Sequence, residues 1–254
     1  MNDNFWKYFK EIYADIPRQG PGDRLSTRRA LRHLPHATPG RNILDIGCGT
    51  GAQTIHLARL TDAHITAVDN HPPFLAQLKK RATENNLASR ITTGIADMGH
   101  LPFSDHAFDT IWAEGSIFII GFARGLSEWR RLLVPGGCLV VSDFCWLTDN
   151  PHPELEEMLL DGCPEAGDRE SMRRAVKENG YRLLHEFLLP HKGWWNNYYV
   201  PLHRCLLDFR KRYAGNPEAI AVADHCQREI DLYRAHKGAF GYVFFVMQRR
   251  ENGG

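Results

Sequence analysis

The residues with the clearest chemical potential are an acid and three glycines in the run DIGCGTG, namely Asp45, Gly47, Gly49 and Gly51. Glycine has no Cβ, so the backbone can turn tightly and approach a ligand closely. Free amides at the start of a following helix attract negative charge. The spacing is GxGxG rather than the GxGxxG of dinucleotide sites, and the Asp45 carboxylate would repel a pyrophosphate but bond an ammonium group, directly or through water. The run therefore favours a nucleoside that carries an amino acid.

Two more acids follow the next two β-like runs. Asp69, with Asn70 beside it, ends HITAVD, where α/β nucleoside sites place a carboxylate that accepts both ribose hydroxyls. Ala96, Asp97 and Met98 end the following run, so that the carboxylate of Asp97 can take the adenine amino group while Met98 covers the ring. Taken alone, Asp69 also fits a helix cap and Asp97 an Asx turn. Their joint occurrence after successive strands favours the nucleoside site.

Short β-like runs alternate with helical patterns from residue 42 onward, as in a parallel α/β sheet. Strands are predicted over 42–47, 64–69, 91–96, 108–115, 138–146, 181–190 and 241–248. Helices are predicted over 50–60, 72–86, 122–133 and 169–179. A turn is expected at 135–137, and a loop with a short helical piece around Leu155 is expected at 148–167. The pattern predicts a doubly wound, mostly parallel, seven-stranded sheet of the Rossmann-like kind.

Segments at the two ends of the chain depart from this alternation. Residues 1–39 are predicted to form an N-terminal helical lid on the core, 40–146. In the second half, 147–254, an aromatic and helical insertion at about 192–237 precedes the last strand and is too long for a hairpin turn. We interpret 1–254 as a single domain.

The motifs DIGCGTG, AVD, IAD and LVPGGCLVVSD, in this order over residues 40 to 146, resemble the motif series of class I S-adenosylmethionine (SAM)-dependent methyltransferases. Other stretches, such as RQGPG, WAEGSIFIIGF and GYVFF, resemble a bacterial subgroup of small-molecule methyltransferases without an assigned substrate. The resemblance implies SAM as cofactor, with its pocket at the carboxyl edge of the sheet and Asp69 on the ribose. Arg18, in the turn RQGPG, is expected to close over the SAM carboxylate.

The methyl acceptor is expected beyond the end of the fourth strand, where Glu114 lies. Glu114 could act as a base, orient the acceptor or balance the sulfonium, or it could simply bond backbone amides near residue 115. Trp195, Tyr198 and Tyr199 of the insertion, with Trp146 at the end of strand five, could enclose a small acceptor and exclude water. The alternative is that aromatic side chains such as Trp194 and Tyr199 only dock the inserted helices onto the sheet.

The amino-acid composition limits the classes of partner that we expect for this protein. Lys and Arg number 31 and Asp and Glu 30, a net charge of +1, so a nucleic-acid partner is not expected. Neither an apolar run of membrane-spanning length nor a signal-peptide pattern occurs, and the six cysteines lack metal or disulfide spacing. We expect a cytoplasmic protein without a resident metal; a homodimer is left open.

The sequence thus predicts methyl transfer from SAM to a small-molecule acceptor. Two alternatives use the same glycine loop: transfer of a different group from a SAM derivative, and a SAM-binding regulatory protein whose acceptor pocket has been lost. The acid at the end of strand four and the aromatic insertion favour an active enzyme.

Overall fold

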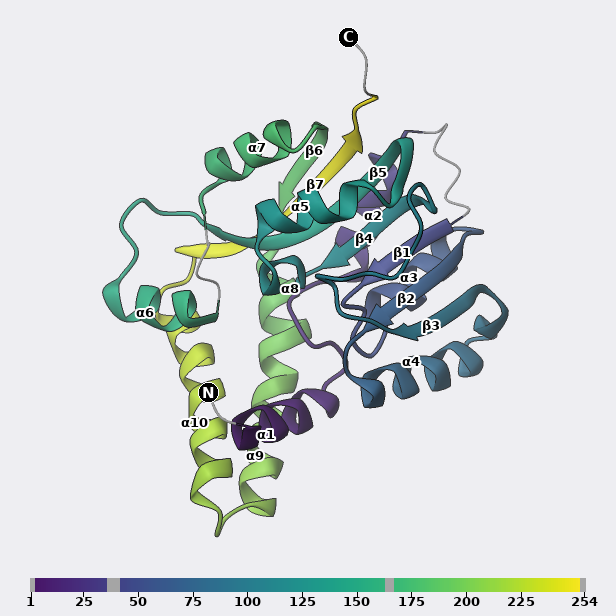
Figure 1. Cartoon of the computed structure of the whole chain (residues 1–254). Coiled ribbons are helices and arrows are strands. Elements are labelled where there is room, and N and C mark those ends of the chain that lie inside the picture. Colours follow the sequence, from purple (N-terminus) through teal and green to yellow (C-terminus); the bar gives the residue numbers. More distant parts are fainter. Residues whose placement is uncertain (1–2, 36–41, 163–166, 252–254) are drawn as a thin grey trace.

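One mixed sheet organises the chain, with strand order β3-β2-β1-β4-β5-β7-β6 (Figure 1). The computed structural model describes residues 3–35, 42–162 and 167–251. The strands are β1 Asn42–Ile46, β2 His64–Asp69, β3 Ile91–Ile95, β4 Phe108–Glu114, β5 Leu133–Trp146, β6 Tyr181–Leu188 and β7 Phe240–Arg249. The predicted Rossmann-like sheet is thereby confirmed.

The strands near the middle of the sheet are buried on both faces, which is why they read as continuous apolar runs. Ile43, Leu44 and Ile46 of β1 are each at most 1% exposed. β1 pairs in parallel with β2 and β4, whereas β7 runs antiparallel to both of its neighbours, β5 and β6. The parallel strands bring their carboxyl ends to one edge, as the nucleoside-site prediction requires.

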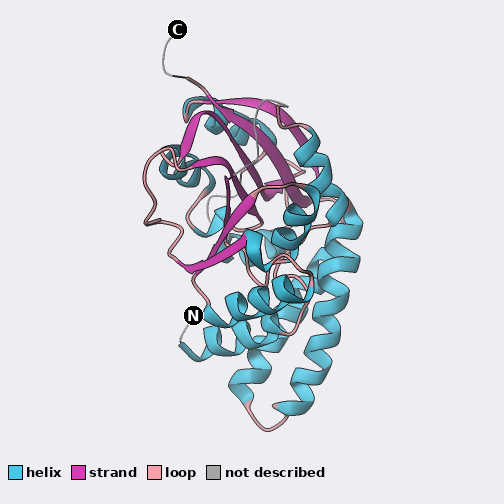
Figure 2. Cartoon of the chain, turned by 90° about the vertical axis from the view of Figure 1, so that its right-hand side faces the viewer, coloured by secondary structure: helices cyan, strands magenta, loops and turns pink. Residues whose placement is uncertain are grey.

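Helices cover the sheet and extend beyond it. They are α1 Asp3–Ala14, α2 Arg24–Arg32, α3 Ala52–Leu60, α4 Pro72–Glu84, α5 Phe122–Arg130, α6 Pro153–Gly162, α7 Arg169–Glu178, α8 His191–Trp194, α9 Val200–Arg212 and α10 Pro217–Ala235. α1 packs against α9 and α10, and these three helices form a layer that projects below the sheet (Figures 1 and 2). The N-terminal helix therefore packs against the two long helices of the second half of the chain.

The expected turn at 135–137 is wrong, because β5 already begins at Leu133. Phe108 pairs with Leu133, and the register shifts before Thr110 pairs with Cys138. Gly136, with φ +73, absorbs this irregularity inside the strand. A proline and two glycines therefore produced a bulge rather than a chain reversal.

The second half of the chain is more helical than predicted. The short helical piece expected around Leu155 is a full ten-residue helix, α6. The aromatic run becomes a π-helical turn, η3, Trp195–Tyr199, which joins α8 to α9. π-Helical turns are rare in proteins overall, but those that occur are often found at functional sites.

Candidate functional site

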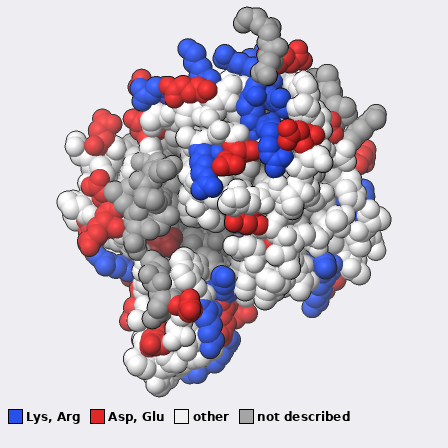
Figure 3. All heavy atoms as spheres, viewed as in Figure 1, with Lys and Arg blue, Asp and Glu red and all other residues white. Residues whose placement is uncertain are grey.

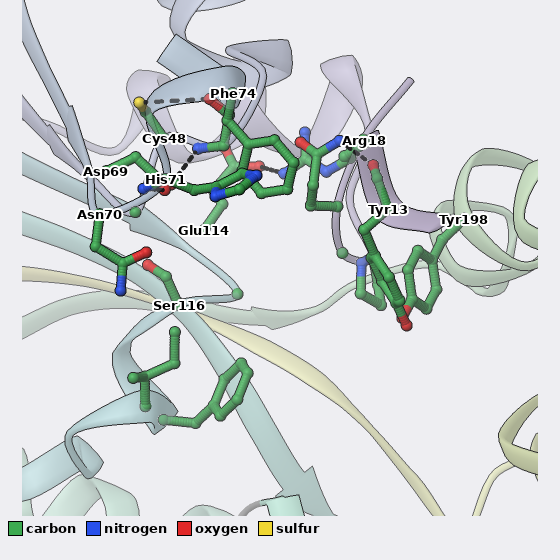
Figure 4. Close-up of a pocket in the computed structure, with 18 of the residues that line it drawn as sticks. Tyr13, Arg18, Cys48, Asp69, Asn70, His71, Phe74, Glu114, Ser116 and Tyr198 are labelled. Atoms are coloured by element: carbon green, nitrogen blue, oxygen red, sulfur yellow. Dashed lines mark hydrogen bonds and ion pairs between the residues drawn. The ribbon is translucent and has the colours of Figure 1, made fainter. Parts of the chain in front are cut away.

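The strand ends predicted to bind a nucleoside open into a cavity of about 710 Å³ (Figure 4). In open α/β sheets, ligands bind outside the carboxyl ends of the strands. The predicted site residues that line this cavity are Arg18, Gly47, Gly49, Asp69, Asn70, Ala96, Asp97, Met98, Glu114 and Tyr198. The fold thus joins the glycine loop and part of the aromatic insertion in one space.

The glycine loop follows β1, and its turn depends on a backbone hydrogen bond and on positive φ angles. Gly47 donates from its N–H to the carbonyl of Val68 at 2.9 Å. Gly47 and Gly49 have φ values of +67 and +54, which residues with a Cβ rarely adopt. A Cβ on Gly47 would lie 2.5 Å from the Cβ of Ser116, so the loop forms a cradle that tolerates no side chain there.

Asp69 is held in place by the loop that it faces. Its Oδ2 accepts the N–H of Gly49 at 2.9 Å, and its Oδ1 accepts the N–H of His71 at the same distance. Burial raises the pKa of Asp69, and these amides partly oppose the shift. Each carboxylate oxygen has more than one lone pair, so both can still accept hydroxyl donors from the cavity. This donor set and the glycine cradle fit a ribose and its neighbouring groups.

Asp97 lines the same cavity from an exposed turn. Its Oδ1 accepts the N–H of Gly99 at 2.9 Å, and this bond lowers the Asp97 pKa. The Asx turn considered as the alternative reading therefore exists, and the residue also faces the expected adenine region. Met98 is fixed nearby, since its carbonyl accepts the indole N–H of Trp129 at 2.9 Å.

Two predicted cofactor residues do not line the cavity. Asp45 lies beneath the loop, where it accepts Thr54 Oγ1 at 2.6 Å and Gln53 Nε2 at 3.2 Å. Burial raises its pKa to about 7. Gly51 caps α3 with φ +84, and a Cβ there would meet Leu78. Both residues support the loop from behind.

Glu114 is surrounded by side-chain donors, and not by the backbone amides of the alternative interpretation. Oε2 pairs with the guanidinium of Arg18, and Oε1 accepts Thr27 Oγ1 at 2.7 Å and Trp112 Nε1 at 2.9 Å. Figure 4 shows Arg18 and Glu114 between the Asp69 side and the tyrosines. Because Arg18 precedes α2 and Thr27 lies within it, Glu114 ties the N-terminal segment to the end of β4.

The N-terminal segment also contacts the glycine loop itself. Gln19 Oε1 accepts the N–H of Thr50 at 2.8 Å, while Gln19 Nε2 donates to the carbonyl of Tyr13 at 2.9 Å. On its other side, Asn197 Nδ2 donates to the carbonyl of Gly22 at 2.9 Å. The segment between α1 and α2 thus lies over the cavity, fastened to both halves of the chain.

Of the four aromatic residues predicted to bind the acceptor, Tyr198 lines the cavity and three do not. Trp195 lies under Arg234, with the guanidinium 5.1 Å from its ring centroid. Tyr199 is buried behind Tyr198. Trp146 packs edge-on against Phe144 of the same strand, β5.

The cavity also contains groups that motif reasoning missed. Tyr13 reaches it from α1, where it bonds Tyr198 hydroxyl to hydroxyl at 2.8 Å. Glu229 lines it from α10. The signal for Glu229 was present in the sequence, because it is three residues after Cys226 and four before Tyr233, within the apolar stripe of that helix.

Within residues 3–35, 42–162 and 167–251, no group of three or more His, Cys, Asp or Glu side chains is arranged to hold a metal ion. No helix in these ranges is long and apolar enough to cross a membrane.

Comparison with known proteins gives a family match over the core. Residues 43–137 match the family model described as "Methyltransferase domain". The chain is 28% identical over 180 residues to the O-methyltransferase rstn1 of Aspergillus nomiae, a match covering 68% of this chain and 79% of that protein. It is 35% identical over 137 residues to the methyltransferase GfsG of Streptomyces halstedii, covering 54% of this chain and 49% of the relative. The chain thus spans about half the length of GfsG.

Two solved structures share the fold over nearly the whole chain. YjhP from E. coli superposes with a TM-score of 0.84 at 21% identity, covering 96% of this chain and all of that one. A SAM-dependent methyltransferase from Geobacter sulfurreducens, crystallised with S-adenosylhomocysteine (SAH), superposes with a TM-score of 0.81 at 22% identity and covers 96% and 98% of the two chains. At these identities the likeness establishes the fold, including the N-terminal and inserted helices.

Proposed function

We propose that this chain, a class I SAM-dependent methyltransferase, transfers the methyl group of SAM to a small molecule held in the same cavity. The family match over residues 43–137 and the curated methyltransferase relatives support the activity. The single observation that supports the acceptor assignment is the continuity of the cavity from Asp69 to Tyr198. Its volume of about 710 Å³ lies within the range of small-molecule sites, roughly 300–1,000 Å³.

The residues proposed to bind SAM fall into groups according to the part of the cofactor that each would contact. Asp69, with Asn70, would accept the ribose hydroxyls, and Asp97 with Met98 would enclose the adenine. When bound, SAM supplies an electrophilic methyl group on a positively charged sulfur. The glycine loop would let the backbone approach the cofactor, and Arg18 in the segment above it would help to exclude water from the closed site.

We assign Glu114 a positioning role instead of the base that was one sequence interpretation. Its two oxygens already accept Arg18, Thr27 and Trp112, so it fastens the N-terminal segment over the cavity. These three donors come from the segment before α2, from α2 itself and from β4, so they fix the orientation of the carboxylate, as a positioning role requires. The same contacts support the proposal that residues 1–39 act as a lid belonging to one methyltransferase domain, 1–254.

The choice of a small molecule over a nucleic acid rests on charge. On the face shown in Figure 3, basic and acidic side chains are interspersed and form no continuous basic band among the described residues. A nucleic-acid groove would present such a band. We propose cytoplasmic action, in keeping with the free thiols of Cys48, Cys138, Cys145, Cys205 and Cys226. A homodimer is the remaining proposal on partners, to be checked by light scattering.

Calorimetric titration with SAM, SAH and NAD tests the central assignment. Micromolar binding of the two sulfur nucleosides without binding of NAD is the expected result. If neither sulfur nucleoside bound, the assignment of the cavity to SAM would be overturned. An acceptor screen then follows with the loaded protein.

A further inference from the structure

Beyond the glycine loop, the cavity becomes an aromatic chamber. We use this name for the space lined by Phe9, Tyr13, Trp194, Tyr198, Phe240 and Tyr242. These side chains come from α1, α8, η3 and β7, so the chamber is walled by both ends of the chain. Tyr13 and Tyr198 lie on the opposite side of the close-up from Asp69 and Asn70 (Figure 4). The chamber is therefore the mostly aromatic part of the same cavity, beside the proposed cofactor site.

One acid, Glu229 on α10, lines this chamber. Its Oε1 accepts the hydroxyl of Tyr199 at 3.0 Å, and a hydrogen bond from Tyr198 also stabilises its charge. The side chain keeps some accessible surface, as expected for a cavity wall, yet burial raises its pKa to about 7. Tyrosine hydroxyls, rather than a guanidinium, are the side-chain donors that lower this pKa against the effect of burial. Glu229 differs in this respect from Glu114, whose partner is Arg18.

An acid placed this way selects ligands by charge. An anionic acceptor would bring a second negative charge next to Glu229, in surroundings where charges are poorly screened. A cationic acceptor would add to the positive sulfonium of SAM and to Lys10, which also lines the cavity. A neutral acceptor adds no further charge to the cavity, which is the least costly combination in a closed site. The aromatic walls favour an acceptor with an apolar body.

We propose that the aromatic chamber is the acceptor site, and that it takes a neutral, largely apolar molecule with a phenol-like hydroxyl that donates to the Glu229 carboxylate. This inference rests on the proposed function. The carboxylate accepts Tyr199 and Tyr198, and its two oxygens have further lone pairs for the acceptor hydroxyl. As the acceptor oxygen gains the methyl group of SAM, its proton passes to the Glu229 carboxylate and the sulfonium becomes the neutral thioether of SAH. A carboxyl that titrates near neutrality is suited to taking this proton and releasing it afterwards.

Binding of three probes with one shared ring system tests the proposal independently of turnover. Protein saturated with SAH is titrated calorimetrically at pH 8 with 2-naphthol, 2-naphthoate and 2-naphthylmethylammonium. We expect 2-naphthol to bind at least about tenfold more tightly than either charged probe, equivalent to about 1.4 kcal/mol. Tighter binding of either charged probe, or no binding of any probe, would overturn the proposal.

The variant Glu229→Gln separates a role in binding from a role in structure. Without the negative charge, 2-naphthoate should gain about tenfold in affinity while 2-naphthol loses a few-fold. Glu218→Gln, on the exposed side of the same helix, is the matched control and should leave all three affinities unchanged. Glu229→Asp should restore the preference for 2-naphthol in part. An unchanged order of affinities in Glu229→Gln would refute the role of Glu229.

Titration with SAH alone distinguishes the two levels of failure. If SAH binds and the naphthyl probes show no preference by charge, only the acceptor proposal is wrong. If SAH does not bind, the cofactor assignment fails first. A gain in naphthoate affinity cannot follow from a merely destabilised fold, so circular dichroism of the variant serves only to confirm that it is folded.

Discussion

The two halves of the cavity are built in different ways. The cofactor half is made largely by backbone turns at successive strand ends, where Gly49 bonds Asp69 and Gly47 approaches Ser116. The aromatic chamber is made by side chains such as Tyr13 and Tyr198, which are 185 residues apart in sequence. Local sequence dictates the first half, while packing of distant helices dictates the second. Sequence motifs can therefore indicate the cofactor of this chain, although they do not indicate its methyl acceptor.

The largest expected effect concerns the segment that joins the two halves. Arg18→Ala removes the cation from Glu114, and a buried ion pair that loses one partner costs about 3–5 kcal/mol. We expect lower stability in urea and faster proteolysis near Arg18. Arg28→Ala, an exposed arginine on α2, is the control. Identical unfolding curves for the two variants would show that the ion pair does not fasten the segment.

Asp143 is a buried acid that does not line the cavity. A substitution there tests how burial changes the pKa of a carboxyl without altering the proposed site. Burial raises the pKa of Asp143 on β5 to about 7, with the amide of Phe144 as the opposing hydrogen bond. The native state thus holds a proton that the unfolded chain releases, so wild-type stability falls as pH rises from about 4 to 7. Asp143→Asn should be more stable than wild type above pH 7, by about 4 kcal/mol, with the gap closing towards pH 4.

Denaturant unfolding at a series of pH values checks this, with Asp62→Asn on the surface as the control. A constant difference between Asp143→Asn and wild type across the series would contradict the assigned pKa. SAM binding should be unchanged in Asp143→Asn, since this residue does not line the cavity.

Asp69→Ala tests the cofactor half directly. Loss of a charged acceptor of two ribose hydroxyls should weaken SAM binding about ten- to hundredfold, because each hydrogen bond to a charged group contributes about 1.5–3 kcal/mol at most. Calorimetry of the variant against Asp62→Ala measures this. Wild-type affinity would remove Asp69 from the ribose role.

The smallest expected effect is that of Asp97→Ala. Asp97 is exposed, so its contact with the adenine amino group competes with water and should contribute about two- to tenfold to SAM affinity. Calorimetric titration of Asp97→Ala with SAM measures this loss of affinity. A loss larger than that of Asp69→Ala would reverse the order of importance proposed for the two acids.

Much of the fold was predictable because strand periodicity and turn chemistry are local. β2 was predicted residue by residue, and α4 begins at Pro72 as expected, since proline is tolerated in the first helical turn. The start of β5 was not predictable, because the proline and glycines after Leu133 form a bulge only when β4 pairs with them. At this position the pairing of β5 with β4 overrides the local preference of the sequence for a turn.

The sequence by itself determined the sheet, the glycine loop and the acids at the strand ends, because these depend on residues close together in the chain. Only the tertiary structure decided that Asp45 supports the loop from below, that Glu114 bonds Arg18, and that Glu229 faces a chamber closed by α1. These outcomes depend on which side chains meet after distant helices pack. No spacing within one segment encodes such meetings, since packing energy is summed over the whole core.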